Sequence, residues 1–144
     1  MKILVLNGPN INFIGIREKN IYGEKNYKFL VKKIQDHAKK LKVKAKIIQS
    51  NHEGFLIDLI QKCYFKKYDA IIINPGAYTH YSIALLDALK SVSPIRIIEV
   101  HLSDIFNREI YRNKSLISEV SEKVFFGKGI DSYLEAIDYL LIKW

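Results

Sequence analysis

Four short segments of this 144-residue chain are polar and rich in amide or histidine side chains. They read Asn7-Gly8-Pro9-Asn10, Gln49-Ser50-Asn51-His52-Glu53-Gly54, Asn74-Pro75-Gly76-Ala77-Tyr78-Thr79-His80 and Glu99-Val100-His101-Leu102-Ser103-Asp104. Amides beside glycine and proline make a rigid hydrogen-bonding surface, which suits a small molecule that carries hydroxyl or carbonyl groups. His80 and His101 add groups that can act as acid, base or ligand. The segments therefore indicate a site for a polar small molecule.

Each of these segments follows a short run of apolar, often β-branched residues. The expected strands are Lys2–Asn7, Val43–Gln49, Ala70–Ile73 and Ile95–Val100, with a short fifth strand at Val124–Phe126. Apolar residues at helical spacing predict helices from the N-cap Asn26 to Leu41, at Phe55–Cys63, at Ile83–Leu89 with a cap near Thr79 or Ser82, and at Tyr133–Leu141. Alternating strands and helices form a parallel sheet with helices on both faces, and ligands bind outside the carboxyl ends of its strands. We therefore expect one α/β domain over residues 1–144, with all four segments at one edge.

A long polar loop, Gly8–Gly23, separates the first strand from the first helix, and a loop of this length is a functional candidate. It contains Arg17 and Tyr22. Arginine is scarce in this chain, with four arginines against 19 lysines among the 23 basic residues. Because lysine suffices for solubility, an arginine indicates a place where a planar guanidinium group with parallel N–H donors is needed. The other three are Arg96, Arg108 and Arg112.

The formal net charge of +8 raises the alternative of a protein associated with nucleic acid. The lysines cluster between Lys39 and Lys46, however, where a helix end and an alternating strand with a solvated face account for them. We therefore expect no nucleic-acid partner. Salt-dependent DNA binding without catalysis would favour the alternative.

Several kinds of site lack their sequence signatures. The single cysteine, Cys63, permits no internal disulfide and occupies an apolar helical position that predicts burial. His52, His80 and His101 come from three loops without paired ligand spacing, so we expect no metal. Glycine-rich phosphate loops are absent from the sequence, as is any apolar run near the roughly 18 residues that span a bilayer. We expect a cytoplasmic protein with no membrane partner. The second alternative function, beside nucleic-acid association, is a module that binds a small molecule or nucleotide without catalysis.

Motifs along nearly the whole chain resemble one enzyme family. They are Leu4-Val5-Leu6-Asn7-Gly8-Pro9-Asn10-Ile11-Asn12, Gly15-x-Arg17-Glu18, Tyr22-Gly23, the second and third segments above, Ala84-Leu85-Leu86-Asp87-Ala88-Leu89, Glu99-Val100-His101-Leu102-Ser103 and Arg108-Glu109-x-x-Arg112-x-x-Ser115. In order and spacing they are similar to type II 3-dehydroquinate dehydratase. Asp104 departs from the family pattern, in which an asparagine follows Ser103. The resemblance implies a flavodoxin-like domain without cofactor, assembled as trimers that pack into a dodecamer. It also implies a carbon–oxygen lyase of the shikimate pathway, which reversibly dehydrates 3-dehydroquinate to 3-dehydroshikimate.

The same resemblance implies a role for each matching residue. Tyr22 is the base that removes a proton alpha to the ketone, Arg17 stabilises the anionic species, and His101 protonates the departing hydroxyl. Asn10 helps to hold the enolate. The implied substrate contacts are Asn74, His80, Arg112, the backbone of Leu102 and Ser103, and Asp87 from a neighbouring subunit. Glu99 and Arg108 are implied as residues that lie next to these groups and hold them in position.

Elementary chemistry agrees with these roles. A free tyrosine has a pKa near 10, so a tyrosine base at neutral pH needs a close cation, which Arg17 or Arg108 can supply. A forked Arg112 can hold a substrate carboxylate through two hydrogen bonds. The helix around Asp87 is more apolar than one core face requires, which predicts an interface with a second subunit on its other side.

Overall fold

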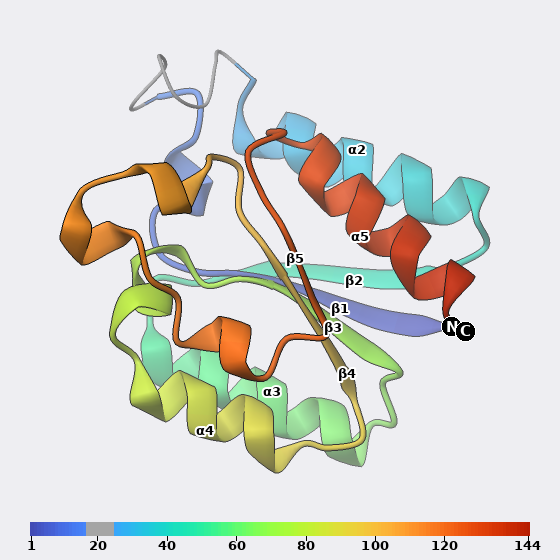
Figure 1. Cartoon of the computed structure of the whole chain (residues 1–144). Helices are drawn as coiled ribbons and strands as arrows, with labels where there is room; N and C mark the ends of the chain where they lie inside the picture. Colours follow the sequence, from blue (N-terminus) through green and yellow to red (C-terminus); the bar gives the residue numbers. More distant parts are fainter. Residues whose placement is uncertain (17–24) are drawn as a thin grey trace.

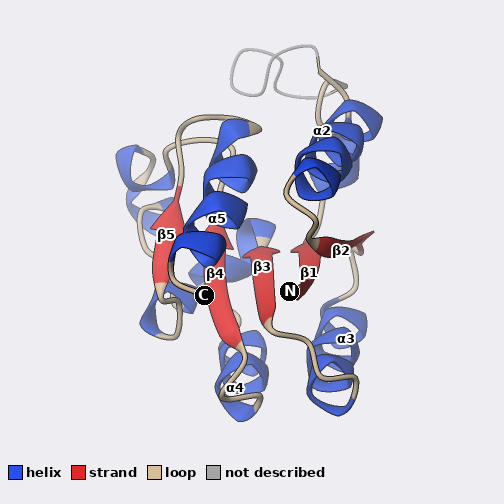
Figure 2. Cartoon of the chain, turned by 90° about the vertical axis from the view of Figure 1, so that its right-hand side faces the viewer, coloured by secondary structure: helices blue, strands red, loops and turns tan. Residues whose placement is uncertain are grey.

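A computed structural model describes residues 1–16 and 25–144, which form a parallel sheet between two helical layers. The strands are β1 (Lys2–Asn7), β2 (Lys44–Gln49), β3 (Ala70–Asn74), β4 (Arg96–Val100) and β5 (Lys123–Phe125). They lie in the order β2-β1-β3-β4-β5, and every pair runs parallel (Figure 2). This is the strand order of flavodoxin-like folds. The expected α/β architecture is therefore confirmed.

Two helices cover each face of the sheet (Figure 1). On one face lie α2 (Tyr27–Lys40) and α5 (Asp131–Ile142), and on the other lie α3 (Glu53–Phe65) and α4 (Ile83–Ser91). Asn26 caps α2 as expected, because its side chain accepts a hydrogen bond from the Phe29 amide at 3.0 Å. Of the two expected caps for α4, Ser82 is the one used, and its hydroxyl accepts from the Leu85 amide at 2.9 Å.

The sheet separates two apolar cores. Ile3 and Val5 of β1 pack with α2 and α5, whereas Leu4 and Leu6 pack with α3 and α4. This division follows from the alternation of side chains along a strand. Because both faces of the central strands are covered, β3 is buried throughout, and its first four residues, Ala70–Ile73, form a continuous apolar run. Cys63 lies in the second core as expected, and burial raises the pKa of its thiol to about 11.

Four strands differ from the prediction by one residue at one or both ends. β3 extends to Asn74 instead of Ile73. β2 begins at Lys44 instead of Val43, because Lys42 turns the chain with a φ of 58° and the Val43 amide still bonds to Ala38 O of the preceding helix. β4 starts one residue later than expected, at Arg96. β5 lies one residue earlier than expected, at Lys123–Phe125.

The loop after β1 is less polar than predicted where the structure describes it. Residues Ile11–Phe13 form a short 3-10 helix, η1, and both Ile11 and Ile14 are buried against the core. The beginning of the loop is therefore anchored to the fold. Arg17 and Tyr22 lie outside the described residues.

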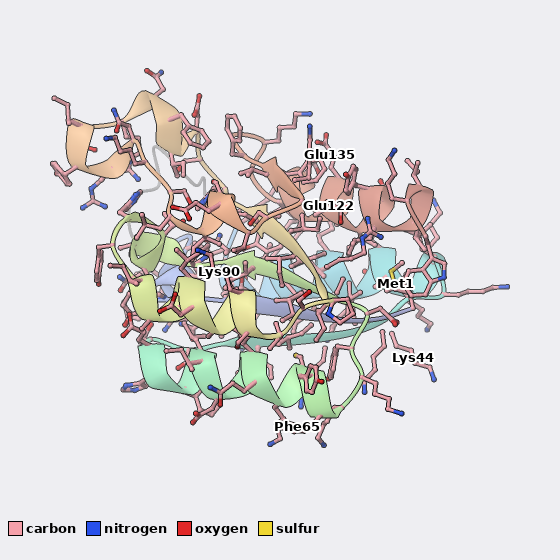
Figure 3. All side chains as sticks on the ribbon, turned by 60° about the horizontal axis from the view of Figure 1, so that its bottom comes forward. Met1, Lys44, Phe65, Lys90, Glu122 and Glu135 are labelled. Atoms are coloured by element: carbon pink, nitrogen blue, oxygen red, sulfur yellow. The ribbon has the colours of Figure 1, made fainter. Side chains whose placement is uncertain are left out.

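The lysine-rich segment has the solvated face that its alternation predicts. Lys44 and Lys46 are exposed on β2, while Ala45 between them is half-buried. Figure 3 shows Lys44 at the periphery of the fold. Among residues 1–16 and 25–144, no helix has the length and apolar character that crossing a membrane requires.

Candidate active site

The loops that follow β1 and β3 pack backbone against backbone. The amide of Gly8 donates to Asn74 O at 2.7 Å. Gly76 has a φ of +58°, and a Cβ on it would lie 2.9 Å from Pro9 O. Glycine is needed at position 76 for both reasons, since a larger residue would be strained and would collide with backbone. These contacts fix the relative position of the two loops.

The loop after β2 supports this arrangement from one side. Gln49 Nε2 donates to Gly8 O at 3.2 Å, and Asn51 Oδ1 accepts from the Asn10 amide at 3.0 Å. The Tyr78 hydroxyl donates to Asn51 O at 2.7 Å. Asn10 itself has a left-handed backbone, with a φ of 66°, which asparagine tolerates well. The segment Gln49–Gly54 therefore meets the other loops as predicted, but it braces them and does not line the cavity.

A cavity opens at the carboxyl ends of β1, β3 and β4, on the side where η2 (Gly76–His80) and η4 (Ile110–Arg112) lie in Figure 1. Its lining consists of Pro9, Asn10, Ile11, Asn74, Gly76, Ala77, His80, His101, Leu102, Ser103, Ile105, Arg108 and Arg112. The strand order reverses between β1 and β3, and open α/β sheets bind ligands at such a point. Most of the residues that the sequence assigned to a site thus gather around one cavity.

His101 is held by a buried carboxylate. Its Nε2 lies 2.6 Å from Glu99 Oε1, and both side chains are almost completely inaccessible to solvent. An ionised carboxylate can only accept a hydrogen bond, so Nε2 carries the proton. Nδ1 is then the ring nitrogen that remains for a ligand. This is the geometry expected of an acid or base whose orientation is fixed by a partner.

Three hydroxyl groups surround the same carboxylate. Glu99 Oε1 accepts from Thr79 Oγ1 at 2.8 Å and from Ser115 Oγ at 2.6 Å, and Oε2 accepts from Ser118 Oγ at 2.6 Å. Burial by itself would raise the pKa of Glu99, but the hydrogen bond and the charge interaction with His101, followed by the hydrogen bonds from Ser115 and Ser118, outweigh it and hold this pKa below its ordinary value. Glu99 is therefore a buried carboxylate that stays ionised. No sequence signal pointed to Ser118.

The remaining cationic and histidine groups lie on the side of η2 and η4. His80 Nδ1 donates to Lys114 O at 2.7 Å, which leaves Nε2 as an acceptor in the neutral ring. The carboxylate of Glu109 lies 3.8 Å from Nε of both Arg108 and Arg112. The cavity thus combines two guanidinium groups with amide and imidazole side chains, a set that suits a hydroxylated carboxylate.

A buried polar network lies beneath Asn74. The Tyr133 hydroxyl donates to Asn7 Oδ1 at 2.7 Å and accepts from Asn74 Nδ2 at 2.8 Å. Asn74 Oδ1 accepts from the Gly76 amide at 3.2 Å, so both ends of this side chain are oriented. Sequence reasoning missed Tyr133, because it occupies an apolar position of the closing helix and its hydroxyl leaves no periodic signal.

One expected site residue does not line this cavity, and two others cannot be placed. Asp87 is exposed on α4 and is not among the lining residues. Arg17 and Tyr22 lie outside the described residues. Within residues 1–16 and 25–144, no three His, Cys, Asp or Glu side chains are grouped so that they could hold a metal ion.

Comparisons with known proteins agree with this geometry. Residues 1–141 match the family model described as dehydroquinase class II. A 3-dehydroquinate dehydratase of Lachnospira eligens is 53% identical over 138 residues, which cover 96% of this chain and 94% of the relative. The crystal structure of type II dehydroquinase from Butyrivibrio crossotus superposes with a TM-score of 0.96 at 53% identity, covering 98% of this chain and 97% of the other.

A more distant structure shares the same fold over the same length. Type II dehydroquinase from Propionibacterium acnes has a TM-score of 0.93 at 33% identity and covers 98% of this chain and 96% of its own. The family match spans the strands, the interlocked loops and the segment that carries Arg108 and Arg112. The chain therefore belongs to the class II dehydroquinase family.

Proposed function

We propose that this chain reversibly dehydrates 3-dehydroquinate to 3-dehydroshikimate, a step of the shikimate pathway and of aromatic amino acid biosynthesis. A proton leaves the carbon alpha to the ring ketone, and a hydroxyl leaves the neighbouring carbon with a proton supplied by the enzyme. The sum is the loss of one water. An anti elimination through an enolate fits the family membership, and the described cavity lining contains no lysine that could form a Schiff base.

The pair of His101 and Glu99 is the observation that carries this proposal. His101 lines the cavity with Nε2 bound to Glu99 at 2.6 Å. The doubly protonated ring holds one proton against Glu99 and offers the other from Nδ1 to the departing hydroxyl. The carboxylate stabilises the cation that delivers this proton and keeps the ring in one orientation.

Tyr22 is the proposed base and Arg17 the group that stabilises the anionic transition state. Both assignments rest on the family motif Gly15-x-Arg17-Glu18 followed by Tyr22-Gly23. The described part of the loop starts in the cavity wall at Pro9, Asn10 and Ile11. Asn10 is the proposed partner of the enolate.

The substrate carboxylate and hydroxyls are assigned to the remaining lining residues. Arg112 is the proposed fork for the carboxylate, with the backbone of Leu102 and Ser103 beside it, and Arg108 adds positive charge. Asn74 and His80 are the proposed partners of the substrate hydroxyls. Asn74 keeps a second N–H after its bond to Tyr133, and His80 keeps Nε2 after its bond to Lys114 O.

The proposal includes an assembly of trimers that pack into a dodecamer, in which Asp87 reaches a neighbouring site. On the outer face of α4, Ile83 is 64% exposed and lies beside the exposed Ala84 and Asp87. A second copy of the chain on this face would bury Ile83 and bring Asp87 against another cavity. The proposed location is the cytoplasm, and the proposed catalytic unit is one domain, residues 1–144, without cofactor, nucleic-acid or membrane partner.

The decisive experiment follows the conjugated enone of the product by ultraviolet absorbance after 3-dehydroquinate is added. The parent protein should turn over, whereas Tyr22→Phe and His101→Ala should each lose about 100- to 10,000-fold in kcat while remaining folded. No enone from the folded parent protein would refute the proposed reaction. Parent-like turnover by Tyr22→Phe would refute the assignment of the base alone.

A further inference from the structure

Glu99 makes more short contacts than the orientation of one histidine requires. Its carboxylate accepts hydrogen bonds from His101 Nε2 and from three hydroxyls at distances between 2.6 and 2.8 Å, and Glu99 itself is inaccessible to solvent. A buried carboxylate needs such donors, since an uncompensated charge in the interior is costly.

The hydroxyls belong to the same segments that build the cavity. Thr79 lies in η2 beside His80, and Ser115 and Ser118 follow η4, which ends at Arg112. The Leu116 amide donates to Thr79 O at 2.8 Å, and the Ser118 amide donates to Ser115 Oγ at 3.2 Å. Glu99 therefore joins β4 to the two loops that carry His80 and Arg112.

We propose that Thr79, Ser115 and Ser118 are positioning residues, whose hydroxyls keep Glu99 ionised so that His101 retains its Nε2–H form and its Nδ1 remains available to the substrate. This inference rests on the proposed function for its consequence in catalysis. The hydroxyl contacts themselves are independent of the reaction.

Neutral donors are the right chemistry for this task. A lysine or arginine beside Glu99 would also keep the carboxylate ionised, but it would compete with the imidazolium for the same negative charge. Hydroxyl groups stabilise the anion and carry no counter-charge. Among the residues that the structure describes, His101 is the titratable group that contacts Glu99. His80, Arg108 and Arg112 lie in the cavity lining, with the Glu109 carboxylate beside the two arginines, and Lys114 and Glu119 neighbour the two serines in the chain.

Ser118 is the clearest of the three to test. Thr79 and Ser115 both donate to Oε1 and lie 2.7 Å from each other, so either can compensate for the loss of the other. Among the residues that the structure describes, Ser118 alone contacts Oε2. Ser118→Ala therefore removes the donor of one carboxylate oxygen and leaves the rest of the cluster in place.

Ser121 offers a matched control in the same part of the chain. Its hydroxyl donates to Ile117 O at 2.9 Å and does not contact Glu99. Carbon-13 NMR of the glutamate side-chain carboxyls, with the Glu99 signal assigned by its absence in Glu99→Gln, follows the titration directly. The nitrogen-15 shifts of His101 report which ring nitrogen holds the proton.

In Ser118→Ala the titration of Glu99 should move to higher pH by about one unit, the size expected for one lost hydrogen bond to a charged group. The fall of kcat on the acid side of its pH profile should move to higher pH together with this titration. At pH 8, kcat should stay within about threefold of that of the parent. Ser121→Ala should change neither quantity. A residue that served packing alone would lower kcat at every pH and leave the titration of Glu99 in place.

An unchanged Glu99 titration in folded Ser118→Ala would overturn the proposal. Should that variant fail to fold, Ser118→Cys keeps the volume with a much weaker donor and should show the same direction, whereas Ser118→Thr should titrate like the parent. Failure of the proposed function is a separate result, since a parent protein that forms no enone still permits the carboxyl titration. A shifted titration without a shifted fall of kcat on the acid side would also overturn the catalytic part of the inference.

Discussion

Gly8 lies so close to Pro75 that no side chain fits between them. A Cβ on Gly8 would be 2.4 Å from Pro75 O and 2.6 Å from Pro75 C. Both are backbone atoms of a buried loop, so neither can rotate away as a flexible side chain can. The contact holds the loop after β1 against the loop after β3. It is possible only because position 8 has no side chain.

Gly8→Ala should therefore destabilise the protein by about 1–3 kcal/mol, as overpacked interiors do. It should also raise KM, because Pro9, Asn10 and Asn74 must shift together with the loops that carry them. Urea unfolding and steady-state kinetics measure the two effects. Gly54→Ala is the control: position 54 lies in α3 with nothing within 4 Å of an added Cβ, so this change should be neutral or stabilising by up to about 1 kcal/mol. Equal stabilities for the two variants would contradict the role of the contact.

Tyr133→Phe should separate the buried hydroxyl network from the packing of the ring. The change leaves Asn7 Oδ1 and Asn74 Nδ2 without the hydroxyl they share, which should cost about 1–3 kcal/mol of stability. KM should rise more than kcat falls, because Asn74 is a proposed binding group. Tyr139→Phe, in the same helix, removes a hydroxyl that bonds to the more exposed Glu122 at 3.1 Å and should have little effect. If both variants behave alike, the Tyr133 hydroxyl does not orient Asn74.

Glu99→Gln should change how stability depends on pH. The folded-state pKa of Glu99 lies below the ordinary 4.5, so its ionised form contributes stability that is fully present above that value and is lost as the pH falls through the folded pKa. The parent should exceed the glutamine variant in stability at pH 7, and the difference should shrink below about pH 5. Urea unfolding at a series of pH values measures it.

Glu122→Gln is the comparison for that experiment. The pKa of Glu122 is also lowered, first of all by its hydrogen bond to Arg96, but the pair is partly exposed and solvent screens it. Its pH-dependent contribution should therefore be smaller. A constant difference between parent and Glu99→Gln from pH 7 to the acid range would show that Glu99 does not titrate below its ordinary pKa.

Arg112→Lys should weaken substrate binding although it keeps the charge. A lysine offers one ammonium where a guanidinium offers two parallel donors, so we expect a rise of about tenfold or more in Kd. Calorimetry with the product measures this. The triple change of Lys39, Lys40 and Lys42 to glutamine removes three exposed charges remote from the cavity and should leave activity unaltered. Parent-like affinity in Arg112→Lys would reduce Arg112 to a rim residue.

The shared-site assembly predicts complementation between two inactive variants. Asp87→Ala should lose activity with its own Tyr22 and His101 intact, and Tyr22→Phe should lose activity with Asp87 intact. When the two are refolded together, some interfaces pair an intact Tyr22 with an intact Asp87, and those sites should work. Activity is assayed after light scattering has established the mass of the mixed oligomers. Absence of recovery in confirmed mixed oligomers, or a fully active monomer, would rule out the shared site.

The sequence by itself predicted the architecture and most of the cavity. Local patterns suffice for this, because a buried parallel strand such as β3 contains a continuous apolar run, Ala70–Ile73, and a helix such as Tyr27–Lys40 has a recognisable N-cap and apolar face. The placement of the polar segments follows from one rule, that parallel strands end at the same edge. His80, His101 and Arg112 could be grouped from these patterns and the family motifs alone.

Tertiary structure decided the contacts that make those residues usable. Ser118 meets Glu99 across 19 positions of the chain, and Tyr133 meets Asn7 across 126. Neither contact has a periodic signature, because a hydroxyl at a helical or loop position looks the same whether it faces water or a buried partner. The collision that restricts Gly8 depends on where a second loop lies, and the exposure of Asp87 depends on which face of α4 meets the sheet. Such properties arise only when distant segments are packed together.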